Sequence, residues 1–239
     1  MSAAHRIRLT GRLLRLLDTL ADMPTPPTRE DLDAARHRFV PDVLAPGLNV
    51  VFVGINPGLY SAAVGHHFAR PGNRFWKALH ASGFTDHEWS PFDDQDLPTV
   101  GLGITNLVDR TTASAAELTA EELRTGRGAL EAKIARFRPD VVAILGITAY
   151  RTGFDHTKAD LGPQDDALAK SAVWVLPNPS GLNAHHQLDD LTRRFADLRA
   201  ASRMRQGSRS CTPTRRVRSV RSPCSRASTA APWRTLPGA

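Results

Sequence analysis

Cysteine is almost absent from this sequence of 239 residues. Its two cysteines, Cys211 and Cys224, lie close to the C-terminus, so the first 202 residues contain none. A disulfide framework, a Cys-ligated zinc ion and a four-cysteine iron–sulfur cluster are therefore excluded from that part of the chain. The chain also lacks any apolar run of 18 residues, which argues against a membrane-spanning helix.

Acidic residues and lysine are absent from residues 203–239, although that segment holds nine arginines. The formal net charge of the whole chain is +7. The first 202 residues carry 22 basic and 24 acidic side chains, so their net charge is −2. The segment is rich in Arg, Ser and Pro and has little aliphatic periodicity, which predicts a disordered tail.

The first 27 residues form a separate N-terminal part. The stretch "HRIRLTGRLLRLLDTLADMP" mixes arginine into an amphipathic pattern and lacks the cleavage site of a secretory signal. We interpret it as a basic amphipathic helix that packs loosely or contacts an anion. The proline-rich "MPTPPTRED" follows, where Thr28 and Asp31 have the spacing of a capping box. A folded domain is therefore predicted over residues 28–202.

Within residues 28–202, apolar runs typical of buried strands alternate with helical patterns. The runs are "NVVFVGI", "VGLGITNLV", "DVVAILG" and "AVWVLPNPSG", and the longest helical pattern is "SAAELTAEELRTGRGALEAKIARFRPD", which Pro139 ends. This alternation predicts an α/β fold, namely a three-layer α/β/α sandwich with a mostly parallel central sheet. We find no internal repeat.

Two of these predicted strands end in an Asn-Pro loop. The first reads "VFVGINPGLYSA", and the second reads "VWVLPNPSGLNAHH". Pro57 and Gly58 force the chain to turn after Asn56. Since the carboxyl ends of parallel strands lie at one edge of a sheet, we expect both loops to meet at one crevice. Neither loop has the glycine pattern of a dinucleotide site or a P-loop, and there is no GxSxG motif.

Three motifs of this chain carry a family resemblance. The stretches "GINPGLYSAAVGHHFARPGNRFWKAL", "GITNLVDRTT" and "LPNPSGLN" occur in the order and spacing of the mismatch-specific uracil DNA glycosylases and the related thymine DNA glycosylases. The resemblance extends from about residue 28 to residue 200. It implies a uracil-DNA glycosylase-like fold and excision of uracil and related bases from mispaired double-stranded DNA. It also implies a monomer that needs no cofactor or metal and works in the cytoplasm on DNA, away from membranes.

The resemblance assigns roles around the base that leaves the duplex. A glycosylase must take its target base out of the stack, which is easiest at a mismatch. Phe68 matches the aromatic residue that stacks on this base, and backbone N–H groups near Ile55 and Phe68 match those that bind its carbonyls. The "PSGLN" loop matches the wedge: Leu182 would enter the duplex, and Gly181 and Asn183 would face the widowed guanine. Pro57, Gly58, Asn178 and Ser180 would support the two loops.

Asn56 matches the catalytic position, where its amide would hold a water molecule against C1′. An amide cannot take a proton at neutral pH, unlike the Asp that the fast uracil glycosylases have at this turn, so we expect a slow reaction limited to good leaving groups. Neither loop contains a lysine. A Schiff-base mechanism is therefore not expected, and the resemblance points to a monofunctional enzyme.

Further residues are assigned to the base pocket or to its support. Ser61 would lie near C5 of the base, and Asn106 matches a pocket position that is Lys or Asn in relatives. His66 and His67 could be read as a metal or proton-transfer pair, but we interpret them as pocket lining. Asp109 and Arg110 are interpreted as structural, with an ion pair as one option.

The chain departs from the family after the wedge leucine. Relatives often have Ser-Arg there, whereas this chain has Asn183 and Ala184. His185 or His186 would then have to supply the contact that the arginine makes. The sequence leaves two other functions open: a mismatch-binding module that does not cleave, and an α/β hydrolase of free nucleosides. Asn56 argues against the first, and the protruding Leu182 argues against the second.

Overall fold

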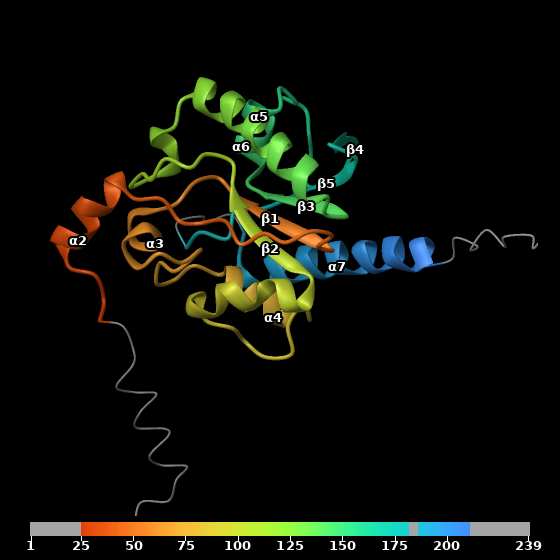
Figure 1. The fold of residues 1–239 in the computed structure, drawn as a ribbon, viewed down its shortest axis with the longest axis horizontal. Helices are drawn as coiled ribbons and strands as arrows, with labels where there is room; N and C mark the ends of the chain where they lie inside the picture. Colours follow the sequence, from red (N-terminus) through yellow and green to blue (C-terminus); the bar gives the residue numbers. More distant parts are fainter. Residues whose placement is uncertain (1–24, 182–185, 211–239) are drawn as a thin grey trace, which may run out of the picture.

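The computed structural model describes residues 25–181 and 186–210 and shows a central sheet between two layers of helices (Figure 1). The five strands are β1 (Val50–Gly54), β2 (Leu102–Asn106), β3 (Val141–Leu145), β4 (Gly162–Leu168) and β5 (Ser171–Leu176). Their order across the sheet is β2-β1-β3-β5-β4. All neighbours pair in parallel except β4, which is antiparallel to β5. The predicted α/β/α sandwich with a mostly parallel sheet is confirmed.

The two layers of helices cover opposite faces of the sheet. Along β1, Val50 and Phe52 belong to one hydrophobic cluster, and Val51 and Val53 belong to the other, as the period of two in a strand requires. The first cluster lies against α4 (Phe75–Ala81) and α7 (Leu188–Ser210). The second lies against α5 (Ala120–Phe137) and α6 (Ile147–Gly153), on the other side of the sheet (Figure 1). Strands β1, β2 and β3 are buried on both faces, which explains their continuous apolar runs.

Shorter elements lie in the connections. They are the α-helices α2 (Arg29–Ala34) and α3 (Leu59–Val64) and the 3-10 helices η1 (Ala35–His37), η2 (Pro91–Val100) and η3 (Ala115–Glu117). The predicted capping box is present at α2, where the Thr28 side chain accepts from the N–H of Asp31 and the Asp31 carboxylate accepts from the N–H of Thr28. Sequence analysis did not predict α3, α6 or β4.

The ends of the folded part differ from the expected boundaries. Helix α7 continues to Ser210, eight residues beyond the predicted end of the domain, so residues 203–210 belong to this helix rather than to a disordered tail. The N-terminal segment 1–24 and residues 211–239 lie outside the described residues, as do the two cysteines. None of the described helices combines the length and apolar character needed to cross a membrane.

The topology creates a crevice at one edge of the sheet. Strand β1 has β2 on one side and β3 on the other, so the chain leaves β1 for β2 and later returns to place β3 beyond β1. Connections that diverge in this way leave room at the carboxyl ends of the strands. The loops that follow β1, β2, β3 and β5 all emerge there because these four strands are parallel.

Candidate functional site

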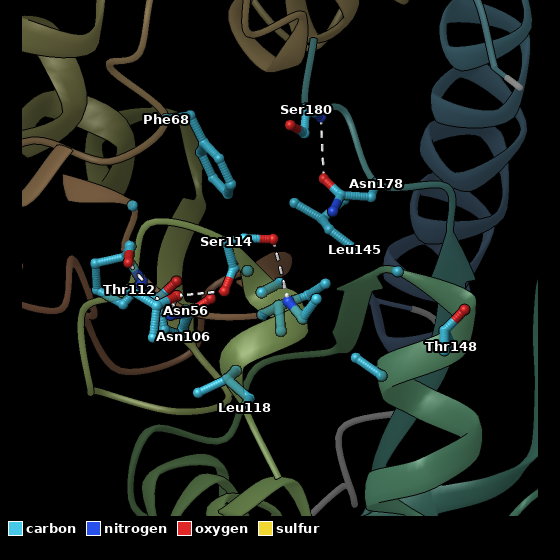
Figure 2. Close-up of a pocket in the computed structure, with 18 of the residues that line it drawn as sticks. Asn56, Phe68, Asn106, Thr112, Ser114, Leu118, Leu145, Thr148, Asn178 and Ser180 are labelled. Carbon is cyan, nitrogen blue, oxygen red and sulfur yellow. Dashed lines mark hydrogen bonds between the residues drawn. The ribbon is translucent and has the colours of Figure 1, made fainter. Parts of the chain in front are cut away.

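A cavity of about 870 Å³ lies at the carboxyl ends of the parallel strands. It is lined by Asn56 after β1, Asn106 at the end of β2, Gly146 after β3 and Pro177 and Asn178 after β5. The two Asn-Pro loops therefore border one cavity, as their position after parallel strands suggests. Figure 2 shows Asn56, Thr112 and Asn106 grouped on one side of this space, with Asn178 and Ser180 across from them.

Most of the site residues predicted from the sequence line this cavity. These are Ile55, Asn56, Pro57, Gly58, Ser61, His67, Phe68, Asn106, Asn178 and Ser180. Gly181 packs against the chain at Gly72, where an added Cβ would lie 2.6 Å from the Gly72 carbonyl oxygen. Leu182 and Asn183 lie outside the described residues.

The Asn56 side chain is fixed by hydrogen bonds to its nitrogen. Nδ2 donates to the Thr112 hydroxyl at 2.7 Å, to the Arg110 carbonyl oxygen at 2.8 Å and to the Pro57 carbonyl oxygen at 3.3 Å. Because carbonyl oxygens can only accept, the amide must turn its NH₂ group toward them. Oδ1 accepts no hydrogen bond from a described residue and is left as an acceptor at the cavity.

The segment that holds Asn56 is itself anchored to α5. The Arg110 guanidinium forms two hydrogen bonds with Glu122, at 2.6 and 3.1 Å, and these, together with the hydrogen bonds from Thr119, lower the pKa of Glu122 to about 2. Asp109 accepts from Lys133 Nζ at 3.2 Å. Asp109 and Arg110 therefore pair with α5 residues rather than with each other. The Thr112 hydroxyl donates to the Ser114 carbonyl oxygen at 2.9 Å, which leaves its oxygen free to accept from Asn56.

Phe68 stands in a strained turn beside the cavity. Its φ of 54° lies in the left-handed region, which phenylalanine rarely adopts. One face of its ring stacks on Phe75, with 4.2 Å between the ring centroids. A Cβ on Gly54 would lie 2.5 Å from Asn106 Oδ1 and 3.4 Å from the Phe68 ring. Glycine at the end of β1 therefore lets the Asn106 amide and the Phe68 ring lie close to the backbone there, at the cavity wall.

Ser61 and His67 are largely committed to holding this turn. The Ser61 hydroxyl accepts from the N–H of Ala69 at 3.1 Å, and His67 Nε2 lies 2.9 Å from the Pro41 carbonyl oxygen. Burial lowers the pKa of His67, and this outweighs the opposing effect of that hydrogen bond and of the Asp94 and Asp42 carboxylates. His67 is thus a neutral imidazole that donates from Nε2. His66 Nδ1 lies 3.0 Å from Asp94 Oδ1, and His66 is not among the residues that line the cavity.

Arg74 holds the second Asn-Pro loop, residues 177–186, at both ends. Its guanidinium donates to the carbonyl oxygens of Pro179 at 3.5 Å, Ser180 at 2.5 Å and His186 at 2.6 Å. His186 also lines the cavity, and its Nδ1 lies 2.5 Å from Asp190 Oδ2. One side chain at the start of α4 therefore joins the two ends of this loop.

Sequence reasoning assigned no role to Thr112, Arg74 or the wall formed by residues 113–120 and 146–152. Thr112 and Arg74 occur in the motifs "GITNLVDRTT" and "GNRFWKAL", so the motif matches were the available signal. Their contacts with Asn56 and with Pro179 span more than fifty residues of sequence, which no local pattern encodes.

The lining of this cavity contains no lysine, and the described residues form no metal-binding cluster there. The four lysines, Lys77, Lys133, Lys158 and Lys170, all belong to the described part of the chain, and none of them lines it. Within residues 25–181 and 186–210, no three His, Cys, Asp or Glu side chains are grouped so that they could hold a metal ion.

Compared with known protein families, residues 41–199 match the uracil DNA glycosylase superfamily. The match covers well over half of the chain and contains β1 to β5, both Asn-Pro loops and the cavity between them.

Proposed function

The chain belongs to the uracil DNA glycosylase superfamily and is thus a DNA glycosylase of base excision repair, and we propose that it is of the mismatch-specific uracil/thymine type. In this proposal the enzyme is monofunctional. It hydrolyses the N-glycosidic bond of uracil and related bases mispaired with guanine.

The observation that carries the mechanism is the orientation of the Asn56 amide. Its Nδ2 is bound to Thr112 and Arg110, so Oδ1 can accept a hydrogen bond from a water molecule in the cavity. That water attacks C1′ while the electron pair of the glycosidic bond leaves with the base as an anion. The proton that the attacking water loses passes to solvent, and the departed base anion takes up a proton from solvent. Asn56 positions the water without deprotonating it, which limits the reaction to bases that leave readily.

Extrusion of the base supplies the selectivity for mispairs. Unstacking and unpairing require a few kcal/mol, and less at a mismatch. The Phe68 ring, held from behind by Phe75, offers the extruded base a surface on which to stack. We propose that Leu182 fills the gap in the duplex and that Gly181 and Asn183 contact the unpaired guanine, as the resemblance implies.

The positions of the lysines support a monofunctional enzyme. A glycosylase that also cleaves the strand needs an amine to form a Schiff base with C1′. Each of the four lysines of the chain lies away from the cavity lining.

The proposal is tested on duplex oligonucleotides with a single uracil, thymine, hypoxanthine or 3,N4-ethenocytosine opposite guanine or adenine. We expect base release opposite guanine, with strand breaks appearing only after alkali and no borohydride-trapped complex. Breaks without alkali, or a trapped complex, would overturn the monofunctional assignment. Tight mismatch binding without base release would favour a non-cleaving mismatch-binding protein instead.

A further inference from the structure

A buried carboxylate, Asp94, lies behind the turn that carries Phe68, outside the cavity lining. Asp94 belongs to η2 and is 0% exposed. Its Oδ2 accepts from the N–H of His67 at 3.0 Å, and its Oδ1 lies 3.0 Å from both His66 Nδ1 and Gln95 Nε2. A carboxylate that is fully removed from water requires such partners, and both oxygens of Asp94 have one.

The main-chain N–H groups of this turn show what Asp94 achieves. His66 N–H donates to the Ser61 carbonyl oxygen, His67 N–H to Asp94, and Ala69 N–H to the Ser61 hydroxyl. Among these four consecutive residues, only Phe68 N–H has no hydrogen-bond partner in the described part of the chain. Buried N–H groups are nearly always paired, so a free N–H beside a cavity is a donor suited to a ligand.

The strain of the turn explains why an anchor is needed. Phe68 has a φ of 54°, a conformation that persists only when its surroundings impose it. Asp94 fixes the residue before Phe68, and Ser61 fixes the residue after it. Phe75 fixes the ring. Without Asp94, the peptide that presents the Phe68 N–H can rotate toward a relaxed conformation.

We propose that Asp94 is a positioning residue for base recognition. Its carboxylate holds the His66–Phe68 turn so that the Phe68 N–H donates to a carbonyl oxygen of the extruded base. This inference rests on the proposed glycosylase function and adds a residue that acts through the main chain. Because negative charge accumulates on the departing base, a preorganised N–H donor stabilises the transition state more than the bound substrate.

The test compares two leaving groups, uracil and 5-fluorouracil, each opposite guanine in the same duplex. The fluorine stabilises the departing anion, so 5-fluorouracil depends less on a hydrogen-bond donor. For Asp94→Ala we expect the single-turnover rate with uracil to fall by about a hundredfold, the size of losing one preorganised donor, and the rate with 5-fluorouracil to fall much less. Inhibition by free uracil should weaken in parallel.

Two further variants separate positioning from folding. Asp94→Asn keeps the shape and an acceptor for the His67 N–H but removes the charge, so we expect a loss of a few-fold with uracil and a smaller loss with 5-fluorouracil. If Asp94→Ala does not fold, the comparison of uracil with 5-fluorouracil is made with Asp94→Asn alone. Asp96→Ala removes an exposed carboxylate from the same η2 helix and should leave both rates unchanged.

The outcomes distinguish this inference from the proposed function. If the wild-type protein releases neither base, the proposed function is wrong. If the wild type is active and the Asp94 variants lower both rates by the same factor, or lower neither, Asp94 does not position the donor. An intact folded structure, measured by the thermal unfolding midpoint, together with a loss specific to uracil supports the assignment.

Discussion

The two Asn-Pro loops have similar sequences, yet the structure holds them in different ways. In the first loop, residues 56–58, the Asn56 side chain makes the fixing contacts, and its amide nitrogen is bound by Thr112 and Arg110. In the second loop, the main chain is held from outside, since Arg74 binds the carbonyl oxygens of Pro179, Ser180 and His186.

This difference separates the two roles that the proposed reaction requires. A side chain whose orientation is fixed by hydrogen bonds suits the task of placing a water molecule against one carbon atom. Fixing the ends of a loop through its main chain suits a segment that must enter a duplex as a unit. We therefore expect changes in the first loop to act on the chemical step and changes in the second to act on base extrusion.

The largest effect is expected for Asn56→Ala. Loss of the water-positioning oxygen should lower single-turnover excision from a G·U duplex by at least about a hundredfold. Binding of the same duplex, measured by fluorescence anisotropy, should change little because the grip on DNA lies elsewhere. A comparable loss of binding and rate would contradict this division between the loops.

Among the changes that act on the two Asn-Pro loops, Thr112→Val should have the next largest effect. The change keeps the side-chain shape but removes the hydroxyl that accepts from Asn56 and donates to Ser114. We expect about a tenfold slower excision at saturating enzyme, the value of one buried hydrogen bond that is lost, and recovery in Thr112→Ser. Thr99→Val, which removes an exposed hydroxyl from η2, is the control. Equal rates for Val and Ser at position 112 would show that the hydroxyl does not orient Asn56.

Leu182→Ala tests the second loop. If Leu182 offsets the loss of stacking, its truncation should slow release of uracil opposite adenine several-fold more than release opposite guanine, because the well-paired base is harder to extrude. Val100→Ala, which shortens an exposed apolar side chain, should change neither rate. Equal slowing on both duplexes would mean that Leu182 is not the wedge.

Arg74→Lys tests whether the loop works through its anchors. An ammonium group is a single point of charge and cannot reproduce the geometry with which the guanidinium binds both ends of the loop. Because Arg74 acts through the loop, Arg74→Lys should also slow release of uracil opposite adenine more than release opposite guanine. The difference between the two duplexes should be no larger than in Leu182→Ala. The double variant should be less than additive, and full additivity would show that the two residues act independently. Lys77→Ala removes an exposed positive charge from the same helix as a control.

The sheet and its buried strands could be predicted because continuous apolar runs in β1, β3 and β5 directly reflect burial on both faces. Strand β4 could not be predicted in the same way. Its sequence "GPQDDAL" is polar and mostly exposed, and its hairpin with β5 turns at Ala169 and Lys170, which have φ values of 47° and 78°. Such turns usually contain Asn or Gly, so Ala-Lys gives no signal.

The lining of the cavity could be predicted where a motif coincides with the end of a strand, and its supporting residues were missed where distant segments meet. Asn56 and Asn178 follow strands, so topology alone places them at the crevice. Thr112, Arg74 and Asp94 act through contacts made across the fold, and one of these residues sits in a 3-10 helix that resembled a plain polar loop. The roles of these polar side chains can be inferred only from the hydrogen-bond partners that the fold brings to them.

The smallest effect on excision is expected from removing residues 211–239. The cut is placed there because α7 continues to Ser210, so an earlier cut would remove part of a helix. The deleted segment carries six arginines, whereas residues 1–202 have a net charge of −2. If these arginines contact phosphates, each contact releases condensed counterions, and the logarithm of the affinity falls with the logarithm of salt concentration by about 0.9 per contact.

Phosphate contacts carry no information about the damaged base, so truncation should weaken binding to damaged and undamaged duplex by a similar factor and flatten the salt dependence by several units. Single-turnover excision at saturating enzyme should stay the same, because Asn56, Phe68 and Thr112 all lie in the fold that precedes the cut. An unchanged salt dependence would show that the segment does not contact DNA. A collapse of the single-turnover rate would show instead that residues 211–239 support the fold. The chemical step would then depend on this segment as well as on the first Asn-Pro loop.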